Sequence, residues 1–155
     1  MPSELTQKPK VTDKSFSSTA AYLEYLSTTV MESHALTDMS ILRDYLAPDF
    51  EMVDETIHNC PVPPSSNLED HLRNTAIFKK QNPGWRVFIC NVNRSMVKGA
   101  NTAEVWMTCR GCDNPDDSMF NRESVSVLHW RRRREDGGWV CYRHSGIRGG
   151  GDFFP

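Results

Sequence analysis

The sequence predicts an α+β fold in which helices pack on one face of a bent antiparallel sheet. Apolar residues recur at helical spacing in the first half of the chain, and from Trp85 onward they alternate as in strands. An Asp-Gly turn at 136–137 joins the last two predicted strands. The length of 155 residues suits one domain. We therefore expect a loose tail over 1–17 and a single domain over 18–155.

Three helices are predicted before the four longer strands. Serine and threonine residues at 17–19 offer an N-cap for a helix that ends near Ala35. Asp38 caps a short helix that ends at Tyr45, because the chain reaches Pro48. A third, amphipathic helix covers about 67–81. One face of the first helix carries Leu23, Leu26, Val30 and His34.

The strands are predicted from alternation. In the segment 49–57, Phe50, Met52 and Asp54 share a face, so an apolar face continues into a carboxylate. Four longer strands follow, at about 85–97, 102–112, 120–133 and 138–147. Bends at Gly99 or Gly111 would let the sheet curl.

Composition limits the classes of function. With 18 basic and 20 acidic residues the net charge is −2, which gives no chain-wide attraction for nucleic acid or anionic membranes. No apolar run approaches a membrane span, and the first residues do not resemble a signal peptide. Five cysteines without framework spacing predict reduced thiols and a cytoplasmic protein. Cys109 and Cys112 lack a second pair, so no metal is expected.

The run of arginines at 131–134 admits two interpretations, a nucleic-acid contact or a solvated hairpin tip. Successive side chains of a strand point to opposite faces, so the four arginines cannot present one tract to a duplex. The hairpin tip is favoured, and replacing all four with glutamine is expected to leave fold and activity nearly unchanged.

Several short stretches resemble a known family. They are "LHW" at 128–130, "DGGW" at 136–139, "IR" at 147–148 followed by phenylalanine, and "SHALTDMSILRDYLAP" at 33–48. The sequence is similar to the SnoaL-like group of the NTF2-like superfamily, and within it to fungal scytalone dehydratase-like proteins. This resemblance implies a cystatin-like cone, with three helices packed on a curved antiparallel sheet around a cavity.

Most of the dehydratase catalytic groups are replaced here. The resemblance places the two tyrosines that hold water over the substrate on His34 and Asp54. It places a histidine of the family on Ile89, and an asparagine and a serine on Val127 and Val125. Scytalone itself is therefore not expected as the substrate.

His34 and Asp54 are the predicted acid/base centre, since the resemblance puts both at the cavity mouth. The alternative is a structural pair that holds helix to strand. His129 is a third catalytic candidate, because the resemblance turns its strand face toward the cavity; a packed, hydrogen-bonded histidine is the alternative. The predicted substrate contacts are Val30, Trp106, Glu123, Val127 and the lid residue Phe153.

Three further histidines are not assigned to the acid/base centre. His144 and Arg143 point to opposite faces of the last strand, and the sequence leaves open which of them is inside. His58 and His71 are interpreted as surface residues.

We expect a cofactor-independent dehydratase, isomerase or cyclase that acts on a small polycyclic or aromatic metabolite, in fungal secondary metabolism. The alternative is a non-catalytic binding or interaction domain on the same fold. A homo-oligomer, dimer or trimer, is expected, because Leu128 and Trp130 are assigned to the strand face away from the cavity.

Overall fold

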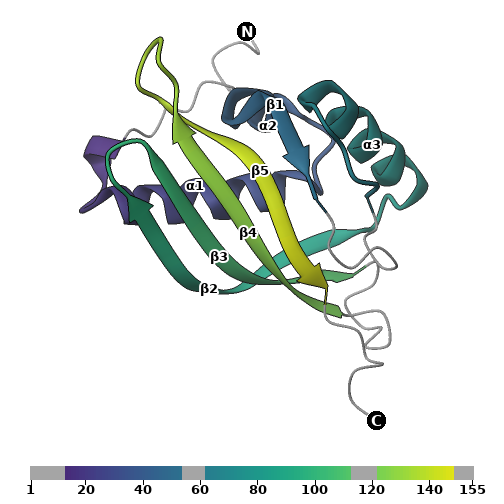
Figure 1. The fold of residues 1–155 in the computed structure, drawn as a ribbon. Coiled ribbons are helices and arrows are strands. Elements are labelled where there is room, and N and C mark those ends of the chain that lie inside the picture. The colour runs from purple at the N-terminus through teal and green to yellow at the C-terminus, as the bar shows by residue number, and fades with distance from the viewer. Residues whose placement is uncertain (1–12, 54–61, 113–121, 149–155) are drawn as a thin grey trace, which may run out of the picture.

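The computed structural model describes residues 13–53, 62–112 and 122–148, which form three helices and a five-stranded sheet (Figure 1). A short 3-10 turn, η2 (Asp13–Ser15), precedes the first helix. The helices are α1 (Thr19–Ser33), α2 (Ser40–Tyr45) and α3 (Leu68–Gln81). The strands are β1 (Leu46–Met52), β2 (Arg86–Lys98), β3 (Thr102–Cys112), β4 (Arg122–Arg132) and β5 (Trp139–Arg148). The predicted helices and the four long strands are confirmed to within about two residues.

Polar side chains begin the two longer helices, and the cap of the first was predicted. The Ser18 hydroxyl accepts a hydrogen bond from the backbone N–H of Ala21 at 3.0 Å. The Asn67 side chain accepts one from the N–H of Asp70 at 2.8 Å. These bonds satisfy N–H groups that the first turn of a helix leaves without an internal partner.

The sheet has the order β1-β5-β4-β3-β2 and is mixed. β2 to β5 pair antiparallel, as predicted. β1 instead lies parallel to β5, with Leu46 opposite Cys141. The prediction of a wholly antiparallel sheet was wrong at this edge, because alternation within β1 does not encode the direction of a partner that follows much later in the chain.

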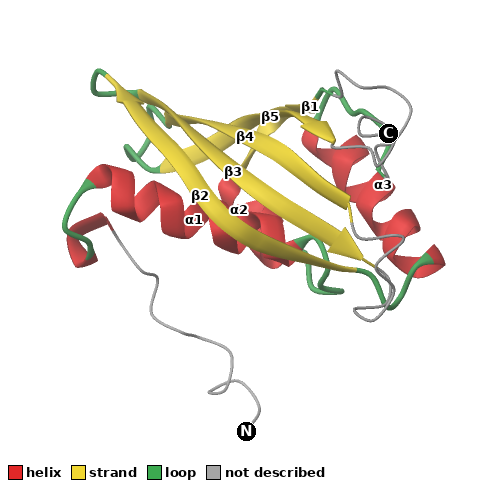
Figure 2. Ribbon diagram, turned by 90° about the horizontal axis from the view of Figure 1, so that it is seen from below, coloured by secondary structure: helices red, strands yellow, loops and turns green. Residues whose placement is uncertain are grey.

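The helices cover one face of the sheet, which we call the inner face (Figures 1 and 2). α1 packs mainly against β2, and α3 against β1. The indole N–H of Trp130 in β4 donates to the hydroxyl of Ser27 in α1 at 2.9 Å. Neighbouring residues Leu128, Val105 and Met107 are almost fully buried in the same core. None of the helices in the described residues lies on the opposite, outer face.

This packing inverts the faces that the sequence analysis assigned to β4. Leu128 and Trp130 were expected on the strand face away from the cavity, in an oligomer contact, but they belong to the core under the helices. Val125, Val127 and His129 alternate with them and therefore lie on the outer face. Both faces of β4 are apolar, so alternation separated the two sets of residues without identifying the inner one.

Irregular pairing accounts for the curvature of the sheet. The register shifts between Ile89 and Asn91 and between Val92 and Arg94 in β2, and again between His129 and Trp130 in β4. The predicted bend at Gly99 was wrong, since that residue, with φ of 63°, lies in the turn from β2 to β3. The predicted Asp-Gly hairpin turn is confirmed.

Within the described ranges, no helix is both long and apolar enough to cross a membrane.

Candidate functional site

Two histidines meet between α1 and α3. His34 is the C-cap of α1, and its Nδ1 lies 2.9 Å from the carbonyl oxygen of Val30. Its Nε2 lies 2.8 Å from Nε2 of His71, a residue of α3 that is 1% exposed. The prediction of His71 as a surface residue was wrong. His71 falls between Leu68 and Leu72 on the apolar face of α3, a helical spacing that could have revealed its burial.

The hydrogen bonds fix the tautomers of this pair. A carbonyl oxygen only accepts, so Nδ1 of His34 carries a proton. Burial lowers the pKa of His34, so the ring is neutral and its Nε2 accepts. His71 must then donate from Nε2, which leaves an unprotonated Nδ1. That Nδ1 is buried and has no hydrogen-bond partner among the described residues.

A third histidine and an aromatic ring complete the surroundings. Phe50 of β1 packs on His71, with ring centroids 4.7 Å apart. His144 of β5 lies opposite Leu128 and so faces inward. Arg143 is on the outer face, where its Nε lies 3.7 Å from a carboxylate oxygen of Glu51. The structure thereby decides which of these two neighbours is inside.

The inner histidines are neutral at pH 7. Burial, with smaller contributions from His34 and His144, lowers the pKa of His71 to about 2. Burial also lowers the pKa of His144 to about 3, and nearby His34 and His129 add to the effect. Neutral imidazoles of this kind can accept or relay protons at pH 7 without first losing one.

Other predicted inner residues have different outcomes. Asp54, the expected partner of His34, and the lid residue Phe153 lie outside the described residues, as does His58. Val30 is buried in the core and contributes its carbonyl oxygen to His34. In the part of the chain that the structure describes, no group of three or more histidine, cysteine, aspartate and glutamate side chains is arranged to hold a metal ion.

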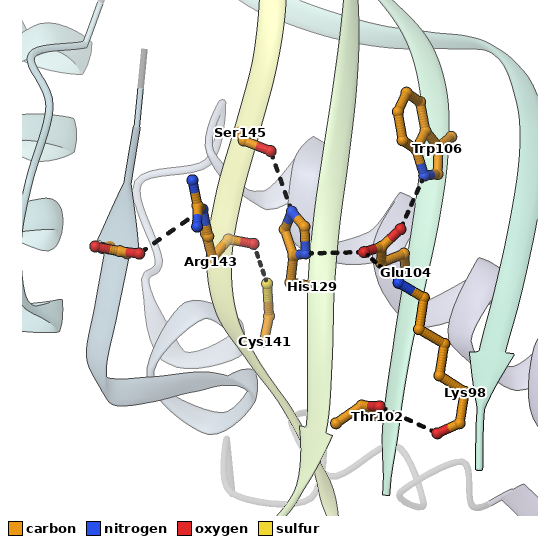
Figure 3. Close-up of polar contacts among 9 residues, drawn as sticks. Lys98, Thr102, Glu104, Trp106, His129, Cys141, Arg143 and Ser145 are labelled. Carbon is orange, nitrogen blue, oxygen red and sulfur yellow. Dashed lines mark hydrogen bonds and ion pairs between the residues drawn. The ribbon is translucent and has the colours of Figure 1, made fainter. Parts of the chain in front are cut away.

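His129 belongs to a separate network on the outer face (Figure 3). Its Nε2 lies 3.1 Å from the hydroxyl of Ser145, and its Nδ1 lies 3.6 Å from a carboxylate oxygen of Glu104. The same carboxylate accepts from Lys98 at 3.0 Å and from the indole N–H of Trp106 at 3.4 Å. The cavity-facing positions expected for His129 and Trp106 were wrong.

Two other predicted substrate contacts are also on this outer face. Glu123 is exposed and pairs with Arg110 at 2.8 Å. Val127 is buried, but it lies opposite Trp106 on the outer side of the sheet. Their placement follows from the same inversion of the β4 faces.

The order Glu104, His129, Ser145 resembles the acid–histidine–serine chain of nucleophilic hydrolases. The distance of 3.6 Å between His129 Nδ1 and Glu104 exceeds hydrogen-bond length, and the shorter contact of Glu104 is with Lys98. Burial also lowers the pKa of His129, although Glu104 opposes this effect. We interpret the network as a polar ladder that links β3, β4 and β5.

No model of a protein family matches the sequence, and no curated protein sequence matches it. Solved structures do match. One is a protein with a cystatin-like fold from Caulobacter vibrioides, with TM-score 0.67 and 13% identity over 84% of this chain and 89% of that one.

Two further structures carry functional names. A provisionally assigned dehydratase of the NTF2-like family from Streptomyces avermitilis has TM-score 0.63 and 19% identity, covering 84% of this chain and 95% of the other. A ketosteroid isomerase-like protein from Erwinia carotovora has TM-score 0.63 and 9% identity, covering 87% and 99%. At these identities the likeness concerns the fold. The chain has the NTF2-like, or cystatin-like, fold that its sequence predicted.

Proposed function

We propose that the protein is a cofactor-independent acid/base enzyme, a lyase or isomerase, with the His34–His71 pair at its centre. The observation that carries this proposal is the buried Nδ1 of His71, which holds a lone pair and has no partner among the described residues. A buried polar atom without a partner is costly in a folded protein, and such atoms are often used in catalysis.

The pair can accept a proton in two linked steps. A substrate C–H bond breaks, its proton goes to Nδ1 of His71, and its electron pair stays on the substrate as an enolate or related anion. His71 can then pass its Nε2 proton to Nε2 of His34 across 2.8 Å. The positive charge on His34 lies at the C-terminus of α1, where the helix dipole and the Val30 carbonyl stabilise it.

The low pKa of His71 defines what else the reaction needs. A base with a pKa of about 2 is protonated only when a negative charge develops next to it. The substrate anion supplies one such charge, and a neighbouring carboxylate would supply another. From the sequence we assign that second role to Asp54, which follows the strand that carries Phe50 and Met52.

Return of the proton to another substrate atom gives isomerisation. Departure of a substrate hydroxyl group, which takes the proton back from the histidine pair and leaves as water, gives dehydration. Solved neighbours that carry isomerase and dehydratase names support this class of chemistry on the fold. The apolar residues around the pair favour a small polycyclic or aromatic substrate, and on the sequence resemblance we assign the reaction to fungal secondary metabolism. The second candidate is a binding domain, in which the histidine pair serves packing alone.

The test is proton abstraction in heavy water. A panel of polycyclic and aromatic ketones is incubated with the protein in D₂O, and deuterium incorporation is followed by mass spectrometry. We expect incorporation with wild type and a loss of at least about a hundredfold with His71→Gln. His129→Gln, a histidine change on the outer face, should leave the rate unchanged. Binding of a ketone without incorporation in the wild type would instead establish the binding domain.

A further inference from the structure

A groove of about 570 Å³ lies between the segment that follows α1 and the last turns of α3. Its volume falls in the range of sites for small organic ligands. Part of its lining is apolar and includes Leu36, of which half is exposed. The apolar part of the lining is formed by Leu36 and Met39 from one side and by Ala76 and Pro83 from the other. Neither His34 nor His71 lines the groove.

Three cations line the same groove, namely Lys79, Lys80 and Arg86, and no aspartate or glutamate does. None of the three is within ion-pair distance of a carboxylate that the structure describes. The cationic part of the groove therefore lacks a described counter-charge from the protein.

The cations are brought together by a shared acceptor. Nζ of Lys79 donates to the carbonyl oxygens of Pro83 at 3.0 Å and of Trp85 at 3.4 Å. A guanidinium nitrogen of Arg86 donates to the same Trp85 oxygen at 2.9 Å. Two positive charges thus converge on one oxygen atom. Burial and the charge of Arg86 both lower the pKa of Lys79, as expected for like charges held close together.

Helix α3 explains only part of this cluster. Lys79 and Lys80 are in its last turn, where cations interact favourably with the helix dipole. Arg86 belongs to β2, beyond the end of the helix, and turns into the same groove. An anion bound there would offset the repulsion between Lys79 and Arg86.

We propose that this groove binds a small amphiphilic carboxylate. The carboxylate accepts charge-assisted hydrogen bonds from Lys79, Lys80 and Arg86, and the apolar body packs on Leu36 and Met39. This site goes beyond the proposed acid/base function and does not depend on it.

The experiment compares naphthalene-2-carboxylate with naphthalene-2-carboxamide, which matches it in shape and lacks the charge. Isothermal titration calorimetry on the full chain should show binding of the carboxylate at least about tenfold tighter than the carboxamide. Arg86→Gln and Lys79→Gln should each weaken carboxylate binding by about tenfold. Arg94→Gln, an exposed arginine on the outer side of β2, is the matched control and should leave the affinity unchanged.

A second variant tests the location without touching the charges. Ala76 is exposed on α3, so Ala76→Trp should fill the groove, keep the fold by circular dichroism and abolish binding. Equal affinity for carboxylate and carboxamide, or unchanged carboxylate affinity in Arg86→Gln, would overturn the proposal. So would binding to phosphatidylglycerol vesicles without binding of the free carboxylate. Loss of binding in His71→Gln alone would move the ligand to the histidine pair.

Discussion

His144 and His129 lie on adjacent strands, one on each face of the sheet, and their surroundings differ in kind. His144 faces the helices and is partly buried, and burial lowers its pKa to about 3. His129 is surrounded by Ser145, Glu104 and the more distant Lys98, so burial and a carboxylate act on its pKa in opposite directions. The comparison shows that burial dominates the pKa of the inner histidine, whereas on the outer face a carboxylate opposes the effect of burial.

The largest expected difference between the faces concerns two tryptophans. Trp130→Ala removes a fully buried side chain and its hydrogen bond to Ser27, so the free energy of unfolding should fall by about 3–5 kcal/mol. Trp106→Ala on the outer face, where the residue is 38% exposed, should cost under about 1 kcal/mol. Urea unfolding of both variants measures this difference. Equal losses would show that the outer face is as tightly packed as the inner one.

Acid should destabilise the protein through the inner histidines. Their folded pKa values lie below the unfolded value of about 6.5, so the unfolded state binds more protons as the pH falls. The free energy of unfolding is therefore highest above pH 6.5, and it decreases as the pH falls toward the pKa values of the folded state. Between pH 7 and pH 5 each inner histidine should remove up to about 2 kcal/mol from the free energy of unfolding.

The variant His144→Phe keeps a ring on the inner face of the sheet and removes one titrating group. Its stability, measured by urea unfolding at pH 7 and pH 5, should change less with pH than that of wild type. ¹⁵N NMR titration of His144 provides an independent check, because a measured pKa near 6.5 would contradict the low value whatever the variant does.

The arginine run gives a smaller effect. Arg131 lies over the ring of Tyr142 and reaches Asp49 of β1 through two bonds, at 2.6 and 3.1 Å. The expectation that all four arginines are dispensable is therefore revised. Arg131→Gln should lower the free energy of unfolding by about 1 kcal/mol, since the pair is partly exposed. Arg134→Gln is the control and should change it by less than about 0.5 kcal/mol.

The last prediction concerns oligomeric state, for which we expect a change in mass and little change in the free energy of unfolding. A homo-oligomer remains a prediction, and its contact is now assigned to the outer face, where Trp106, Phe88 and Val125 are each more than a third exposed. Light scattering should give a multiple of 17.7 kDa for wild type, and Trp106→Glu should shift the mass toward one chain. A wild-type mass of 17.7 kDa at micromolar concentration would contradict it.

The sequence predicted the elements well because helical and strand periodicities are local. It did not predict which face of β4 is inside, since Val127 and Trp130 are both apolar choices for a core. It also did not predict the parallel pairing of β1, which depends on residues far along the chain.

Of the two histidines in the candidate site, the sequence predicted one. His34 was expected to contribute, and it does form part of a buried polar pair. Its partner His71 could have been found from the apolar face of α3, but the contact itself requires the crossing of two helices. The roles of Asp54 and Phe153 stay predictions.

The pairing of β1 with β5 also has a kinetic consequence. Apart from the bridge between Met52 and Ser65, β1 receives its strand partner only after the chain has been synthesised through β5, since Leu46 lies opposite Cys141. Phe50, which packs on His71, is carried by this late-pairing strand. Contacts between distant parts of a chain close slowly. During synthesis on the ribosome, the histidine centre should therefore be among the last parts of the molecule to form.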